Sequence, residues 1–139
     1  MRKIPVELYH CEILAFNDFK DFQRYCNRQN VLTKDFNGNC LVEMAGLAGG
    51  MAGTLEYQDQ DKCDFFVHVD YSSYEGEDGF AMTDYLESVS HEFVHMSFFI
   101  LDNVGVEVDP SNHEALCYLQ GYLVRQWLEK FKIFENGKK

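Results

Sequence analysis

The sequence predicts an α+β domain, with a small antiparallel or mixed sheet, an N-terminal helix, a later helix carrying the stretch HEFVH, and a long C-terminal helix. Three observations lead to this class. Short apolar runs bounded by turn residues fill the first half, and two long stretches with helical periodicity fill the second. The 139 residues, 46% hydrophobic and 15% aromatic, fit one packed domain over 1–139.

The first segments predict a strand followed by a helix. Residues 4–16 alternate irregularly between Pro5 and the pair Asn17–Asp18, which favours a strand. Residues 18–28 then place Phe19, Phe22, Tyr25 and Cys26 at helical spacing, with Asn17 or Asp18 as the N-cap.

The middle of the chain predicts the remaining strands. Residues 36–39 are typical of a turn, and Leu41 to Ala45 favours a strand. The segment AGLAGGMAGTLEYQ is interpreted as two strands joined at Gly49–Gly50; as a phosphate-binding loop it lacks both the Gly-Lys-Ser/Thr ending and Gly-x-Gly-x-x-Gly. Residues 64–70, DFFVHVD, form the clearest strand, preceded by a polar turn.

Two helices are expected after an acidic loop over residues 74–79. Thr83 is a good N-cap for a helix that reaches Leu101 or Asp102. The last helix is expected to open at 109–111 and to continue through Trp127 to about residue 131.

Charge and cysteine content narrow the classes of function. The formal net charge of -11 disfavours nucleic acid as a partner. No apolar run approaches the roughly 20 residues of a membrane span, so we expect no membrane partner. Five cysteines without a Cys-x-x-Cys pair, and an N-terminus without an apolar leader, favour reduced thiols and a cytoplasmic location.

The stretch HEFVH has the spacing of a zinc site. Residues four apart on a helix share a face, so His91 and His95 can direct ring nitrogens at one point. Glu92 lies about 100° further round the helix, where it can take a proton from a zinc-bound water. The alternative interpretation makes both histidines ordinary residues on a helix whose Val89, Phe93, Met96 and Ile100 pack the core.

A catalytic zinc site needs a third protein ligand, and Glu114 or its neighbour His113 is the candidate. The chain between His95 and Glu114 is long enough to finish one helix and return to the site. Glu114 also fits the last position of a capping box, Ser111-Asn112-His113-Glu114, in which the glutamate bonds back to the helix start.

Over residues 83 to about 125 the sequence resembles the gluzincins, zinc peptidases with His-Glu-x-x-His on one helix and a glutamate ligand on a following one. Asn112-His113-Glu114-Ala115 is similar to the stretch holding that glutamate. The resemblance implies Zn²⁺ bound by His91, His95 and Glu114, with Glu92 as general base. The sequence also resembles, less closely, small phage or prophage proteins that carry the motif.

Two departures from the gluzincin pattern bear on catalysis. Tyr118 stands where thermolysin-like enzymes place an acid that holds a histidine. No tyrosine lies between His95 and Glu114 to stabilise an oxyanion, and Tyr118, Tyr122 and His113 stay open as candidates.

These features predict a zinc-dependent hydrolase, a metallopeptidase that acts on a peptide or protein aligned along an edge strand. If the acidic loop over residues 75–78 borders the cleft, basic substrates are favoured. The alternative is a catalytically inactive zincin-like protein that binds zinc for a structural or interaction role, in a phage-related setting. A metal-free interaction domain requires both the HEFVH motif and the spacing from His95 to Glu114 to be accidents.

Overall fold

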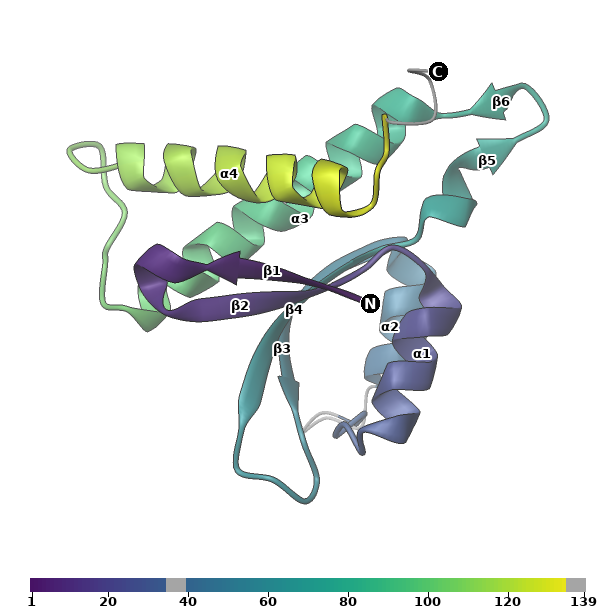
Figure 1. The fold of residues 1–139 in the computed structure, drawn as a ribbon, viewed down its shortest axis with the longest axis horizontal. Helices are drawn as coiled ribbons and strands as arrows, with labels where there is room; N and C mark the ends of the chain where they lie inside the picture. Colours follow the sequence, from purple (N-terminus) through teal and green to yellow (C-terminus); the bar gives the residue numbers. More distant parts are fainter. Residues whose placement is uncertain (35–39, 135–139) are drawn as a thin grey trace.

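A four-stranded mixed sheet forms the centre of the protein. The computed structural model describes residues 1–34 and 40–134. The strand order is β1-β2-β4-β3; β1 and β2 are antiparallel, β2 and β4 parallel, and β3 and β4 antiparallel. The predicted α+β class is confirmed, and the sheet is of the mixed kind (Figure 1). The strands are β1 Arg2–Val6, β2 Cys11–Phe16, β3 Gly50–Glu56 and β4 Cys63–Val69.

Helices cover both faces of this sheet. Two short helices pack on one face and two long helices on the other, so the protein has two apolar clusters separated by the sheet (Figure 1). A two-stranded hairpin and two 3-10 turns complete the described part. The helices are α1 Phe19–Arg28, α2 Leu41–Ala48, α3 Met82–Asn103 and α4 Glu114–Lys130; the smaller elements are η1 Glu7–Tyr9, η2 Tyr71–Tyr74, β5 Glu75–Gly76 and β6 Gly79–Phe80.

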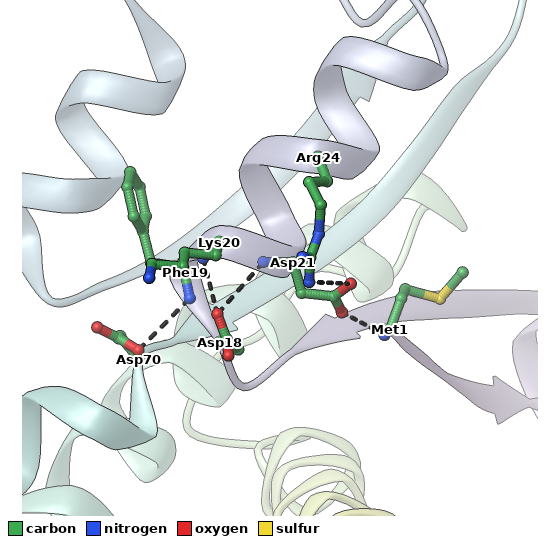
Figure 2. Close-up of polar contacts among 7 residues, drawn as sticks. All are labelled: Met1, Asp18, Phe19, Lys20, Asp21, Arg24 and Asp70. Carbon is green, nitrogen blue, oxygen red and sulfur yellow. Dashed lines mark hydrogen bonds and ion pairs between the residues drawn. The ribbon is translucent and has the colours of Figure 1, made fainter.

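The start of α1 is held by acidic side chains, as Figure 2 shows. Asp18 is the N-cap, and its carboxylate accepts hydrogen bonds from the backbone N–H groups of Lys20 and Asp21 at 2.7 and 3.3 Å. Asp70, at the end of β4, accepts from the Phe19 N–H at 3.4 Å. The cap and the helix Phe19–Arg28 confirm the predicted first helix, and the bond from Asp70 fixes it to the sheet.

The strand expected over residues 4–16 is two strands. β1 and β2 form an antiparallel hairpin in which Val6 faces Cys11. The 3-10 turn η1 connects them, and His10 adopts a left-handed conformation with φ 52°. The irregular alternation in this stretch therefore marked a chain reversal.

The strand predicted over Leu41 to Ala45 is wrong, because this segment is helix α2. Its sequence LVEMAGLA is rich in Leu, Ala, Met and Glu, which are strong helix formers. Gly49 ends the helix with φ 72°, a conformation that glycine adopts without strain, and β3 begins at the next residue. The glycine pair therefore joins a helix to a strand. The predicted turn over residues 36–39 lies outside the described residues.

The two long helices are confirmed, with shifted starts. α3 begins at Met82 after Ala81, so Thr83 lies inside the first turn, and it ends at Asn103. α4 begins at Glu114 because residues 109–112 form a separate turn: the Ser111 N–H donates to the Asp109 carboxylate at 2.7 Å. His113 is the N-cap and no side chain caps the helix, so the capping box does not form. The expected acidic loop contains the β5–β6 hairpin.

α3 and α4 share a buried polar link. The single Trp127 is fully buried on α4 and donates from its indole N–H to the Tyr85 hydroxyl at 2.7 Å. The Tyr85 hydroxyl in turn donates to Asn17 Oδ1 at 2.6 Å. Because buried polar groups are costly when unpaired, this chain fixes α4, α3 and the end of β2 relative to one another.

No helix within residues 1–34 and 40–134 has both the length and the apolar character needed to cross a membrane.

His68 on β4 is a buried histidine. Its side chain is fully buried, and within residues 1–34 and 40–134 neither ring nitrogen has a hydrogen-bond partner. The ring stacks on Phe22 with centroids 5.2 Å apart and lies 5.9 Å from the ring of Phe19. Burial lowers the pKa of His68 from 6.5 to about 4, against the opposing influence of Asp70 and Asp18. The imidazole is therefore neutral at neutral pH.

This burial predicts a pH-dependent stability. Below pH 6.5 the unfolded chain protonates His68 while the folded chain does not, so the free energy of unfolding falls as the pH drops toward 4. Once His68 is protonated in both states, the free energy of unfolding is about 3 kcal/mol lower than at neutral pH. Urea unfolding of wild type and His68→Phe between pH 7 and 4 measures it, and the variant should lose this part of the slope.

His10→Asn is the matched control, because His10 is exposed and asparagine tolerates its left-handed backbone. Equal slopes in wild type and His68→Phe would contradict the account.

Candidate metal centre

The two histidines of HEFVH converge in the structure. The Nε2 atoms of His91 and His95 are 3.2 Å apart and share a hydrogen bond, on side chains that are both exposed on α3. Two nitrogens bound to one tetrahedral zinc at about 2.0–2.1 Å stand about 3.3 Å from each other. The separation of the pair therefore matches what a shared metal ion requires.

The rotation of α3 places this pair at the surface. Val89, Phe93, Met96 and Ile100 are fully buried and form the face that packs on the sheet. Each residue turns the helix by about 100°, so His91 and His95 project from the opposite side. The core stripe named in the alternative interpretation is real, and it does not include the histidines.

Glu92 lies between this exposed stripe and the edge of the sheet. Its side chain is half-buried, and desolvation by burial raises the pKa of the carboxyl group, against the opposing influence of His91 and His95. A methyl group built on Gly50 of β3 would lie 3.4 Å from both Cγ and Oε1 of Glu92. That is an ordinary van der Waals distance, so Gly50 lies directly beside the glutamate, a proximity that the glycine-rich stretch alone did not reveal.

β3 borders the candidate centre as the outer strand of the sheet. Two contacts show that it runs alongside α3. Gly50 neighbours Glu92. Further along, Thr54 lines a cavity with Phe99 and Asn103. At the far end, Val31 bridges Tyr57. Ser88 lies on α3 one helical turn before Glu92. Its Oγ accepts a hydrogen bond from the hydroxyl of Tyr74 in η2 at 2.6 Å.

Glu114, the expected third ligand, lies elsewhere. It begins α4 with its side chain 72% exposed, and its carboxylate lies 4.0 Å from the Nε2 of His113. α4 packs over β1, at the opposite edge of the sheet from β3, and Tyr122 donates to the Pro5 carbonyl at 2.6 Å. Within residues 1–34 and 40–134, no three His, Cys, Asp or Glu side chains are grouped so as to hold a metal. Ligation by Glu114 stays a prediction.

The residues considered for an oxyanion role share the location of Glu114. Tyr118 is 76% exposed on α4, Tyr122 is bonded to Pro5, and the Nδ1 of His113 is 3.0 Å from the Pro110 carbonyl oxygen. None of these contacts connects them with the histidine pair. Their roles therefore stay predictions too.

A larger cavity lies on this other side of the molecule. It has a volume of about 430 Å³ and is enclosed by η1 and the first turns of α4. Its wall is mainly apolar and contains none of His91, Glu92 and His95. The cavity of about 430 Å³ and the HEFVH residues therefore lie in different places. The two histidine nitrogens that could bind a metal are at the HEFVH residues.

No protein-family model, curated protein or solved structure matches the chain. The case for a metal centre therefore depends on the residues and their geometry.

A metal titration tests the histidine pair. We expect the wild type to bind Zn²⁺, and Co²⁺ as a visible substitute, because the two Nε2 atoms are already 3.2 Å apart. His91→Ala and His95→Ala should each weaken binding at least about tenfold, since one of the two converging nitrogens is lost. Isothermal calorimetry and the Co²⁺ spectrum measure the change.

His10→Asn is the matched control, because His10 is an exposed histidine that is not a candidate ligand, and asparagine tolerates its left-handed backbone. An equal loss in His10→Asn, or none in His91→Ala, would overturn the assignment of the pair. Glu114→Ala separately reports whether that carboxylate joins the shell.

Proposed function

We propose that the protein is a zinc-dependent hydrolase, most simply a metallopeptidase of gluzincin-like type. The observation that carries this proposal is the pair of Nε2 atoms 3.2 Å apart beside the half-buried carboxyl group of Glu92. A purely structural zinc site closes with four protein ligands, whereas this arrangement offers two exposed nitrogens next to an acid suited to proton transfer.

In this mechanism His91 and His95 would hold Zn²⁺, and the ion would supply polarisation of a carbonyl group and acidification of water. Glu92 takes a proton from the attacking water and later gives it to the leaving amine. A carboxyl group with a raised pKa holds that proton more readily than an exposed one does. Gly50 of β3 lies next to this carboxyl group.

Glu114 is the third ligand that the gluzincin resemblance implies. Within residues 1–34 and 40–134 it is not grouped with the histidine pair, so ligation requires the chain between α3 and α4, or α4 itself, to move toward the pair.

An extended peptide along the outer edge of β3 is the proposed substrate. Edge strands present unpaired backbone groups that bind peptides by strand addition. β3 runs beside α3 past Glu92, so a peptide added to this edge passes the Glu92 carboxyl group.

The second candidate function is a zinc-binding structural or interaction protein that hydrolyses nothing. The observation that favours it is the exposed position of Glu114, away from the pair. It shares the metal with the first proposal and differs in whether Glu92 acts.

Glu92→Gln separates the two functions. We expect the zinc-loaded wild type to cleave a diverse peptide mixture and Glu92→Gln to lose about a hundredfold or more in rate, because the proton acceptor is gone. Zinc content should stay unchanged, since Glu92 is not a ligand. Mass spectrometry of the peptides and elemental analysis of the protein are the measurements. A wild type that binds zinc and cleaves nothing would favour the second function.

Gly50→Val tests the placement of Glu92. The added side chain would occupy the space next to Cγ and Oε1 of Glu92, so hydrolysis should fall while zinc binding persists. Gly121→Val is the control, because Gly121 is exposed on α4 and its added carbon would contact nothing within 4 Å outside its own helix. Thermal unfolding corrects both variants for stability, and an equal loss of rate in the two would refute the placement.

A further inference from the structure

Asp102 extends the exposed stripe of α3 beyond the histidine pair. Residues seven apart on a helix differ by only about 20° in rotation, so Asp102 shares the face of His95. It stands about 10 Å further along the helix axis. Phe99 lies between them, and its ring stacks on that of His95 with centroids 6.4 Å apart.

A cavity opens at this point between α3 and β3. It has a volume of about 290 Å³ and is open to solvent. Phe65 and Phe99 supply aromatic rings, and exposed Thr54 comes from the edge strand. Asp102 and Asn103 supply the polar groups. A second cavity of about 340 Å³ shares Thr54, Phe65 and Asn103, so the hollow continues past the end of α3.

The chemistry of this cavity fits a long basic side chain. Lysine and arginine lay an apolar stem on aromatic rings and carry the charge at the tip. Asp102 lies in the last turn of α3, where the carbonyl end of the helix dipole adds negative potential and where the chain has no basic residue. The net charge of -11 attracts cations over a longer range.

The spacing relates this cavity to the proposed active site. A peptide on the edge of β3 advances about 3.3 Å per residue, so about three residues span the distance from His95 to Asp102. We propose that the cavity is a specificity subsite, in which Asp102 binds a lysine or arginine about three residues from the cleaved bond. This inference rests on the proposed peptidase function for the cleaved bond, although binding itself does not require hydrolysis.

Binding is measured in the Glu92→Gln background, where peptides are not consumed. Fluorescein-labelled peptides of one apolar background carry Lys, norleucine or Glu at a single guest position. We expect the Lys peptide to bind about fivefold more tightly than the norleucine peptide, as for a partly exposed ion pair. Asp102→Asn should abolish this difference, and Asp102→Lys should favour the Glu peptide.

Asp84→Asn is the matched control. Asp84 is exposed on the same stripe, seven residues before His91 and at the other end of α3, so its replacement should leave the Lys preference intact. Equal binding of Lys and norleucine peptides to the parent, or an unchanged preference in Asp102→Asn, would overturn the subsite.

Cleavage mapping distinguishes this failure from failure of the proposed function. Wild type that cleaves peptides with no basic preference near the cut bond would refute the subsite and leave the peptidase standing. A Lys preference in binding that Asp102→Asn removes, together with no cleavage by zinc-loaded wild type, would support the subsite and refute the peptidase.

Discussion

The rotation of α3 about its own axis is the constraint on which the candidate site depends. Burying the four apolar residues Val89, Phe93, Met96 and Ile100 leaves no freedom in which side faces the sheet. Each of these side chains contributes about 1.5–3 kcal/mol on burial, so a rotation that hid the histidines would be prohibitive. The same rotation sets Glu92 against Gly50 and aligns Asp102 with His95. One packed face thus determines the chemistry of the opposite one.

The sheet edge and α4 have opposite roles around this helix. β3 lies beside the exposed stripe and keeps one edge outward, while α4 covers the other side of α3 and spans toward β1. α4 is held by its fully buried Leu123 and Trp127 and by the bond from Trp127 to Tyr85. The packing that stabilises α4 therefore also holds Glu114 away from the histidine pair.

Local patterns in the sequence were enough to predict α1, β4, the two long helices and the histidine pair. Each depends on a cap or on a periodicity within one segment, as with Asp18 at the start of α1. The helix over Leu41–Ala48 was missed because its apolar residues occupy nearly all sides, which leaves no clear helical period.

Contacts between distant segments were beyond such reasoning. The distance from Glu114 to the histidine pair depends on which edge of the sheet α4 covers, and no interval along the chain contains that information. The proximity of Gly50 to Glu92 joins the outer strand to α3 in the same way. A spacing of seven residues did hold a usable signal for Asp102, since it places that acid on the face of the histidines.

Trp127 is the single tryptophan of the chain, so its burial provides a built-in optical reporter. Its ring meets Phe93, which lies between Glu92 and His95 in the sequence, edge to face with centroids 5.7 Å apart. The indole thus senses α3 from the core side, directly behind the exposed stripe. Its emission spectrum distinguishes a ligand that only occupies the surface of α3 from one that draws α4 out of its packed position.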